Sequence, residues 1–284
     1  MIPEAKSICT HKDSSHKPMK PPVFTNVIVT YNSSVDIPAL LADLGAHAPA
    51  SRTIVVDNAS PDGTADLVQA AFPDVHLVRN AVNVGYARAV NQGVGLSDSP
   101  HVFLLNPDIR IHSGAVFEAL QQCLEREPRV AVAGPLQFKD DGKRLQLNFT
   151  WSYWTPPAFR LYLRYLKGRE LPSSGPLKVA FLNAGCLFIR RSTFDAVGQL
   201  NEKYFLYGEE PDLFLKVMRY GFECRLVPGV SVSHAREQSL RTLPLLRRLQ
   251  FKLRGGLNIA DAVIRGVGNI MLDRLTGRMP GRTS

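Results

Sequence analysis

An apolar run that ends at a carboxylate constrains this chain more than any other short segment. The residues from Val102 to Leu105 are all apolar, and Asn106-Pro107-Asp108 follows them directly. In sheets of parallel strands, ligands bind beyond the carboxyl ends of the strands. An acid at such an end is well placed to hold a divalent metal against a phosphate. The segment therefore predicts that Asn106 and Asp108 belong to a site for a nucleotide-linked ligand.

Apolar segments alternate with helical patterns through the first half of the chain. Strands are expected at residues 24–31, 53–57, 75–78, 101–105 and 130–133, and helices at 37–44, 66–72, 85–96 and 115–125. Strands that alternate with helices at this spacing are typical of an α/β protein with a doubly wound, parallel sheet. The predicted fold class is therefore α/β, with a Rossmann-like nucleotide-binding sheet in this half.

The pattern becomes mixed after Pro135. We expect an extended segment at 178–190, a helix at 211–220 that opens with Pro211 in its first position, and two short strands at 223–227 and 230–234. The chain divides accordingly into a disordered leader (1–22), a nucleotide-binding half (23–134), an acceptor-side and catalytic half (135–235) and a basic helical tail (236–284). The leader lacks the apolar stretch of a secretory signal.

The net charge of +9 is concentrated in the tail, where ten lysine and arginine residues stand against three acids. Such an excess favours an anionic membrane, a nucleic acid or a phosphorylated substrate. No segment matches a nucleic-acid-binding motif, so we expect no nucleic-acid partner. The four scattered cysteines argue against a zinc site or a disulfide framework and favour a reducing compartment. No apolar run reaches the roughly 20 residues of a spanning helix.

Polar side chains follow the first two expected strands. Thr30, Tyr31 and Asn32 end the first strand, and Asp57 ends the second. Together they offer hydroxyl, amide and carboxylate groups at one edge of the sheet, which suits a base and a ribose. Asp57 is the strongest candidate, because an acid at a strand end can accept hydrogen bonds from a nucleotide. The alternative is that Asp57 only begins a turn.

The segment 80–93 contains a second candidate site. Gly85 opens the expected helix, Asn83 precedes it and Arg88 lies one turn inside. A helix N-terminus and a cation suit a diphosphate, although a capped surface helix has the same pattern. The segment has no Gly-x-Gly-x-x-Gly fingerprint, which lowers the case for a dinucleotide cofactor.

Three acids, Glu209, Glu210 and Asp212, crowd the start of the helix expected near Pro211. Clustered carboxylates raise one another's pKa, which suits a general base. Acids also favour helix N-termini because of the helix dipole. Flanking aromatic residues and a glycine nevertheless indicate a concave, partly dry setting. His234, at the end of the last expected strand, is a candidate second metal ligand beside Asp108, although a single histidine is more often structural.

Aromatic residues are concentrated at 151–165, a stretch that contains both tryptophans. Trp151 and Trp154 could stack on an acceptor sugar or lie at a membrane interface. Ordinary packing explains most of these residues equally well. Tyr207, next to the acidic cluster, is a further candidate on the acceptor side.

Taken in order, these motifs resemble those of the inverting family 2 glycosyltransferases of GT-A fold. The blocks that carry the resemblance are Val29 to Asn32, Val55 to Ser60, Asn83-x-Gly85 with Asn91, and Leu104 to Asp108. The later blocks are similar to the rhamnosyltransferase-like branch, which serves bacterial surface polysaccharide assembly; they are Asn183 to Arg191, Phe205 to Leu213, and His234.

The resemblance implies transfer of a sugar, rhamnose in this branch, from a nucleoside diphosphate sugar to an acceptor hydroxyl of a lipid-linked glycan, with inversion. It implies that Asp57 contacts the base and that Asp108 holds Mg²⁺ or Mn²⁺ on the diphosphate, assisted by His234. Glu210 stands where the family has the aspartate of a Glu-Asp pair, its general base. Asn106 replaces the first acid of an Asp-x-Asp motif, which implies weaker metal binding.

Apolar residues recur at helical spacing among the basic residues of the tail. This pattern predicts basic amphipathic helices on an anionic bilayer, or else helices packed on the catalytic part or on a second subunit. We expect a cytoplasmic enzyme at the inner face of the plasma membrane, and no pattern fixes its oligomeric state. Two other functions stay open: a transferase that uses a UDP- or GDP-hexose, and a catalytically dead nucleotide-sugar-binding protein.

Overall fold

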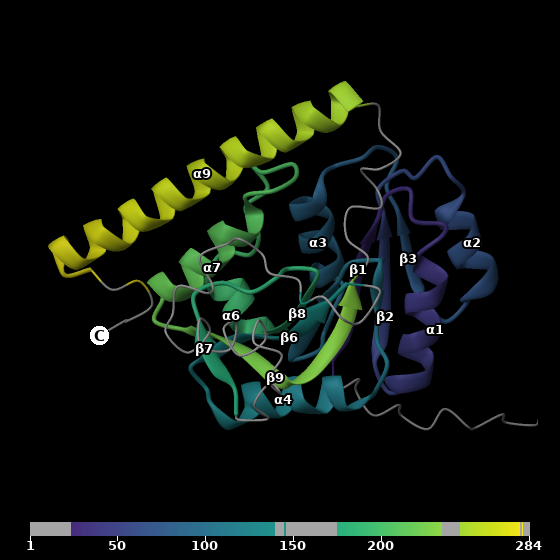
Figure 1. The fold of residues 1–284 in the computed structure, drawn as a ribbon, viewed down its shortest axis with the longest axis horizontal. Coiled ribbons are helices and arrows are strands. Elements are labelled where there is room, and N and C mark those ends of the chain that lie inside the picture. The colour runs from purple at the N-terminus through teal and green to yellow at the C-terminus, as the bar shows by residue number, and fades with distance from the viewer. Residues whose placement is uncertain (1–23, 140–144, 146–174, 235–244, 279, 281–284) are drawn as a thin grey trace, which may run out of the picture.

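The computed structural model describes residues 24–139, 145, 175–234, 245–278 and 280. The expected leader and the aromatic stretch with Trp151 and Trp154 lie outside the described residues. The described residues form one sheet with helices on both faces, and a long helix near the C-terminus lies across the acceptor-side half (Figure 1).

Within the described residues, nine strands form one sheet in the order β3-β2-β1-β4-β8-β6-β9-β5, with β7 paired to β9 outside this path. The strands are β1 (Thr25–Thr30), β2 (Arg52–Asp57), β3 (His76–Arg79), β4 (His101–Leu105), β5 (Ile109–Arg110), β6 (Val130–Phe138), β7 (Leu177–Val179), β8 (Cys186–Arg190) and β9 (Glu223–His234).

The first four strands confirm the expected parallel sheet. β3, β2, β1 and β4 are parallel neighbours, and their ends agree with the expected ones to within one residue. Thr30 and Asp57 are paired at the carboxyl ends of β1 and β2. Because parallel strands end at the same edge, the polar residues that follow β1, β2 and β4 are gathered on one side of the molecule.

The second half departs from the expected strand pattern. The segment expected to be extended at 178–190 forms two strands, β7 and β8, and β8 runs antiparallel between β4 and β6. The two strands expected at 223–227 and 230–234 are one strand, β9, because a bulge opposite Pro135 and Leu136 absorbs the extra residues. β6 continues to Phe138, so the boundary expected after residue 134 lies inside a strand shared by both halves.

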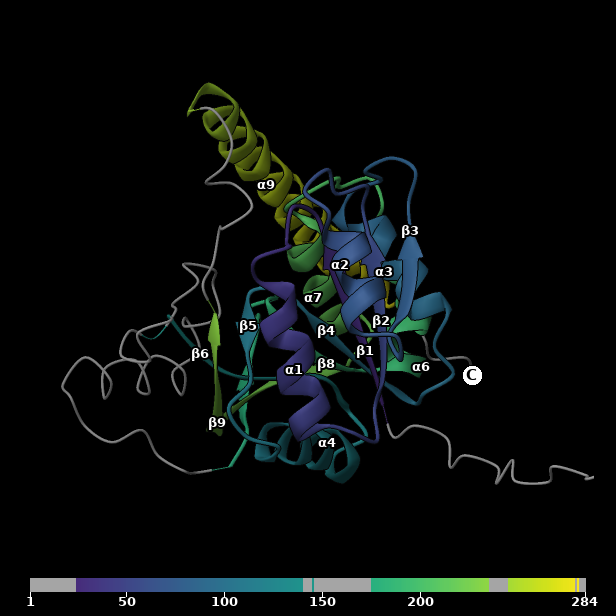
Figure 2. The ribbon, with the colours of Figure 1, turned by 90° about the vertical axis from the view of Figure 1, so that its right-hand side faces the viewer.

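Helices cover both faces of the sheet (Figure 2). They are α1 (Ile37–His47), α2 (Thr64–Ala71), α3 (Tyr86–Gly95), α4 (Ala115–Arg126), α6 (Arg191–Ala196), α7 (Glu209–Arg219) and α9 (Leu245–Thr276). One apolar cluster packs α1 and α4 against Ile28 and Val55, and the other packs α3 and α7 against the face that contains Val27 and Ile54. Neighbouring strand residues turn to opposite faces, so strands buried on both faces are continuous apolar runs.

Two helices differ from expectation. α7 begins at Glu209, so Pro211 occupies the third position rather than the first; the first-turn N–H groups have no partner within a helix, so a proline is tolerated there. In the described part of the tail there is one helix of 32 residues, α9, rather than several, and α9 packs against α7. Within the described residues, no helix has both the length and the apolar character that crossing a membrane requires.

Candidate active site

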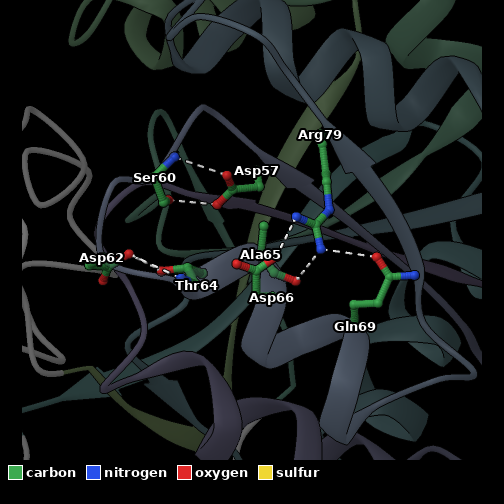
Figure 3. A network of polar contacts seen from close by, with 8 residues as sticks. All are labelled: Asp57, Ser60, Asp62, Thr64, Ala65, Asp66, Gln69 and Arg79. Atoms are coloured by element: carbon green, nitrogen blue, oxygen red, sulfur yellow. Dashed lines mark hydrogen bonds and ion pairs between the residues drawn. The ribbon is translucent and has the colours of Figure 1, made fainter.

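A buried hydrogen-bond network surrounds Asp57 at the carboxyl ends of β1 and β2 (Figure 3). Asp57 Oδ1 accepts hydrogen bonds from Thr30 Oγ1 at 2.8 Å and from Ser60 Oγ at 2.6 Å. Its Oδ2 accepts one from the Ser60 N–H at 2.9 Å, and Figure 3 shows both bonds from Ser60. Thr30 and Asp57 are almost fully buried. A carboxylate offers about four acceptor positions. Asp57 therefore fixes the turn after β2.

Backbone strain marks the same edge of the sheet. Asn32 has φ 55° and Ala59 has φ 61°, values that L residues rarely adopt. The Asn32 N–H donates to Ser60 Oγ at 3.1 Å, and Tyr31 is exposed. Strained residues persist only where the surrounding structure holds them, and they concentrate at functional sites. The strand ends thus bring Thr30, Tyr31 and Asn32 beside the Asp57 network.

Gly85 joins this edge to the turn before α7. Its φ is +88°, its N–H donates to Asn83 Oδ1 at 3.0 Å, and its carbonyl accepts from Asn58 Nδ2 at 3.2 Å. A Cβ at Gly85 would lie 2.8 Å from the Phe205 carbonyl oxygen. The Tyr86 N–H donates to that same oxygen at 2.9 Å. The backbone around Phe205 therefore rests directly on the start of α3, and only glycine permits this approach.

Arg88 is paired with a carboxylate of the chain itself. Its Nε donates to Glu202 Oε2 at 2.9 Å, and Asn91 Nδ2 donates to Glu202 Oε1 at 3.2 Å and to the Leu200 carbonyl at 2.9 Å. These hydrogen bonds, first from Asn91 and then from Arg88, lower the pKa of Glu202. Arg88, expected near the diphosphate, instead holds Glu202, which lies just before the turn into α7.

Asp108 and His234 lie next to each other. Asp108 Oδ1 is 3.3 Å from His234 Nε2, and both side chains are buried. The antiparallel pairing of β5 with β9 brings them together by placing Ile109 opposite His234. No group of three or more histidine, cysteine, aspartate or glutamate residues that could hold a metal occurs in the described part of the chain. Two protein ligands fit Mg²⁺ or Mn²⁺ if substrate phosphates complete the coordination.

Gln137 of β6 orients the His234 ring. Its Nε2 donates to the Asn183 carbonyl at 2.8 Å, which leaves Oε1, 2.9 Å from His234 Nδ1, to accept a hydrogen bond from that nitrogen. His234 Nε2 then faces Asp108. A Cβ at Gly185 would lie 2.7 Å from Nδ1, so this glycine makes room for the ring. Sequence reasoning missed Gln137; its one signal is a polar residue within an apolar strand.

Glu209, the first residue of α7, is almost fully buried. Burial, and to a lesser extent the charge of Glu210, raises the pKa of Glu209 well above its ordinary range. Its Oε2 has no hydrogen-bond partner among the described residues. Burial, followed by the charges of Glu210 and Glu209, also raises the pKa of Tyr86, which places that hydroxyl near the acidic cluster. These surroundings favour the neutral carboxyl form of Glu209.

The other two acids have different surroundings. Asp212 Oδ2 pairs with Lys216 Nζ one turn along α7, at 2.7 Å. Glu210 is partly exposed. The three acids, equivalent in the sequence, are therefore a buried acid, a lysine-paired acid and an acid that reaches solvent.

The turn before α7 is supported by α9. Tyr207 and Gly208 have φ 62° and 99°. A Cβ at Gly255 of α9 would lie 2.5 Å from the Tyr207 ring, so the ring occupies the space that this glycine leaves. Asn258 Nδ2 donates to the Leu206 carbonyl at 3.1 Å. The ring of Tyr207, an expected acceptor-side residue, thus packs on α9 in this structure.

The nucleotide-binding candidates and the acids that begin α7 lie at the same edge of the sheet. The Asn106 N–H donates to the Gly185 carbonyl at 2.9 Å, which joins the end of β4 to the loop before β8. Asp57 and Asp108 follow parallel strands that end at this edge. Glu210 follows the turn that rests on Gly85. The arrangement brings the polar strand ends, the Asp108–His234 pair and the acids of α7 to one edge of the sheet, which is where α/β proteins bind nucleotides.

The model of "Glycosyl transferase family 2" matches residues 25–198, more than half of the chain. The chain belongs to this family and is a glycosyltransferase. It is 30% identical to the N-acetylglucosaminyl-diphospho-decaprenol L-rhamnosyltransferase of Mycobacterium tuberculosis, over 75% of this chain and 76% of that protein. It is 23% identical to the dTDP-rhamnosyl transferase RfbF of Shigella flexneri, over 74% and 68% of the two chains. These relatives place it with the rhamnosyltransferase-like members.

Solved structures show that the fold is GT-A. GalNAc-T7, solved with UDP, GalNAc and Mn²⁺, superposes with a TM-score of 0.59 at 16% identity; the match covers 75% of this chain and 44% of that one. The mannosyltransferase PcManGT from Pyrobaculum calidifontis, in complex with GDP-Man and Mn²⁺, has a TM-score of 0.57 at 15% identity and covers 91% and 76% of the two chains.

Proposed function

We propose that the protein is an inverting rhamnosyltransferase. It moves rhamnose from a nucleoside diphosphate sugar to an acceptor hydroxyl of a lipid-linked bacterial surface polysaccharide precursor. The names of the mycobacterial and Shigella relatives support the donor sugar, and the mycobacterial name supports a lipid-linked acceptor. The observation that carries the proposal is the direct contact of Gly85, at the expected diphosphate position, with the turn that leads into Glu209 and Glu210.

Glu210 is the proposed general base. A base needs a carboxylate that is ionised and within reach of the acceptor. Burial favours the neutral form of Glu209, and the carboxylate of Asp212 is already engaged in an ion pair with Lys216. Glu210 is partly exposed at the start of α7, where an acceptor can approach it. Because Glu209 is buried next to Glu210, we assign it a positioning role rather than the role of the base.

The proposed metal ligands are Asp108 and His234. The carboxylate of Asp108 suits Mg²⁺ or Mn²⁺, His234 adds a nitrogen beside it, and the two solved neighbours were determined with Mn²⁺. When bound, the ion supplies positive charge to the departing diphosphate. Gln137 holds the ring of His234 in the orientation that such binding requires. Asn106 occupies the place of a second acid, so the donor phosphates complete the site.

The reaction follows from these positions as a single displacement. The acceptor oxygen forms a bond to carbon one of the sugar while the bond from that carbon to the diphosphate oxygen breaks. Glu210 accepts the acceptor's hydroxyl proton. The N-terminus of α3 at Gly85 faces the region where negative charge develops on the leaving group. One displacement inverts the anomeric centre, so the product has the configuration opposite to that of the donor.

A different donor sugar is the second candidate. The Haloferax volcanii low-salt glycan biosynthesis hexosyltransferase Agl10 is 25% identical over 72% of this chain and 65% of that protein. A protein named for hexosyl transfer is therefore similar to this chain over most of its length. Donor choice depends on contacts to the sugar ring beyond the diphosphate.

The proposed location of the enzyme is the inner face of the plasma membrane. A lipid-linked acceptor, as named for the mycobacterial relative, is confined to a membrane surface. Cys123, Cys186 and Cys224 are buried and free, which suits a reducing compartment. The basic tail supplies the attraction to anionic lipid.

The test is transfer with purified protein and a diphosphate-prenyl-linked sugar acceptor, supplied with dTDP-rhamnose, UDP-hexoses or GDP-hexoses, with and without Mn²⁺. We expect product from dTDP-rhamnose, stimulation by Mn²⁺ and an inverted anomeric proton coupling in the NMR spectrum. Product from a UDP- or GDP-hexose alone would replace the donor assignment. Donor binding without any release of nucleoside diphosphate would identify a binding protein and overturn the proposal.

A further inference from the structure

We propose that the outward face of α9 is a docking surface for an anionic lipid membrane, an inference that rests on the lipid-linked acceptor of the proposed function. The inner face of α9 packs on the protein. Ala262 is buried, and a Cβ at Gly266 would lie 2.5 Å from the Leu215 side chain of α7. The outward face has no such cover among the described residues (Figure 1).

Large apolar side chains line the outward face. They recur at intervals of four or seven residues, which places them in one stripe along a helix with 3.6 residues per turn. Each is between 60% and 86% exposed. We call this the outer stripe; it consists of Leu253, Leu257, Ile264, Met271 and Leu275. A helix with apolar residues on two opposite faces needs a second apolar partner besides the domain it packs on.

Charge along α9 identifies the partner. The helix has two acids in the sequence, and both pair with basic groups. Asp273 forms an ion pair with Arg219 of α7. Asp261 forms one at 2.8 Å with Lys203, which lies just before the turn into α7. Arg254 and Arg274 flank the outer stripe and are exposed. An apolar stripe bordered by arginines and without an acid is the pattern of a helix that lies in an anionic lipid interface.

A second copy of the chain fits this face less well. Two outer stripes packed together bring the arginines of both helices to the same interface, where like charges repel. Anionic headgroups neutralise those arginines instead. The length of the helix, 32 residues, allows it to lie along the membrane plane with its apolar side buried in the headgroup region.

Docking in this orientation places the base near the acceptor. The inner face of α9 holds the turn before α7 through Asn258 to the Leu206 carbonyl and through Asp261 to the Tyr204 hydroxyl at 2.8 Å. Glu210 follows this turn. A helix is about 10 Å thick, so the base stands roughly that far above the lipid surface. A sugar linked through a diphosphate to a lipid projects into this layer.

The test is flotation of the full chain with vesicles of phosphatidylcholine alone or of equal parts phosphatidylcholine and phosphatidylglycerol. We expect binding to the anionic vesicles only, reduced by salt, and at least tenfold weaker for Leu257→Glu/Ile264→Glu because a charge in the stripe opposes insertion. Leu96→Glu is the matched control: an exposed leucine, at the end of α3, that we expect to bind like the wild type. Melting curves verify that all variants fold.

Equal vesicle binding by the stripe variant and the wild type, or no binding by the wild type, would overturn the inference. So would a dimer in sedimentation that the stripe variant abolishes, because the face would then bind a second copy. Transfer to a short-chain, water-soluble acceptor separates this inference from the proposed function. We expect the stripe variant to keep the wild-type rate there. A wild type that binds vesicles but transfers no sugar contradicts the proposed function and leaves the docking surface standing.

Discussion

The three carboxylates at the start of α7 differ in burial and pairing, which makes the choice of base testable. We expect Glu210→Gln to lower transfer by about 10²- to 10⁴-fold, the usual contribution of general-base catalysis. Donor affinity should stay near the wild-type value, because the amide keeps the shape of the side chain. Single-turnover transfer and calorimetric donor titration measure the two effects. Asp212→Asn is the control, and a larger loss there than at Glu210 would assign the base to Asp212.

Glu209 makes stability depend on pH. Its pKa is raised in the folded state by burial and by Glu210, so folding favours the protonated form. The stability from this group is complete below the unfolded pKa, about 4.3, and declines as pH rises toward the folded pKa, by up to about 1.4 kcal/mol per pH unit. We expect Glu209→Gln to flatten this decline in melts between acid and alkaline pH. Glu118→Gln, on the exposed side of α4, should leave the slope unchanged, and an unchanged slope at Glu209 would refute the neutral carboxyl.

Gln137 affects the metal through the His234 ring. We expect Gln137→Leu to weaken Mn²⁺ binding about 10- to 100-fold in the presence of nucleoside diphosphate, the range for a lost partner of a ligating histidine. Gln137→Glu keeps an acceptor for Nδ1–H and should retain most of the affinity. Electron paramagnetic resonance of free Mn²⁺ measures both. Nucleotide binding without metal shows that the variants fold, and equal Mn²⁺ affinity in all three proteins would remove the proposed role.

At the scale of the helix, α9 contains two adjacent glycines with opposite surroundings. A Cβ at Gly255 meets the Tyr207 ring, whereas Gly256 has nothing within 4 Å. We expect Gly256→Ala to stabilise the protein by about 0.5–1 kcal/mol, since alanine favours a helix over glycine. Gly255→Ala should lose that gain and lower turnover, because it displaces the turn that precedes Glu210. Denaturant unfolding and steady-state transfer measure these effects, and identical behaviour of the two variants would show that α9 does not support the turn.

Elements formed by local pattern could be predicted from the sequence, and those that depend on distant partners could not. The strands up to β4 are apolar runs between helices, so their positions follow from periodicity. The insertion of β8 between β4 and β6 depends on pairing across many residues, and no local signal announces it. The sequence likewise predicted more than one helix where α9 runs unbroken. Gly255 lies inside α9 because it makes room for the Tyr207 ring, and that contact depends on the fold. Gln137 could not be assigned, since its partner His234 is 97 residues away.

At the scale of the whole molecule, the two halves share one sheet. β8 pairs with β4 on one side and β6 on the other, and β6 pairs along its length with β9. We expect a fragment that ends at residue 134 to be unfolded or aggregated, because it lacks β8 and β9 and leaves β4 as a long apolar edge. Circular dichroism and size-exclusion chromatography against the full chain test this. A monomeric, cooperatively melting fragment would show that the first half is an independent domain.

The contact between Gly85 and Phe205 has a consequence for how such an enzyme can change its substrate. The proposed phosphate-binding position and the turn before the proposed base are in direct contact, since a side chain added at position 85 would displace the Phe205 backbone. Variation in sugar preference therefore has to arise on other walls of the catalytic centre. An engineer who seeks a new donor specificity should therefore keep Gly85 and Phe205 and vary residues that do not contact them.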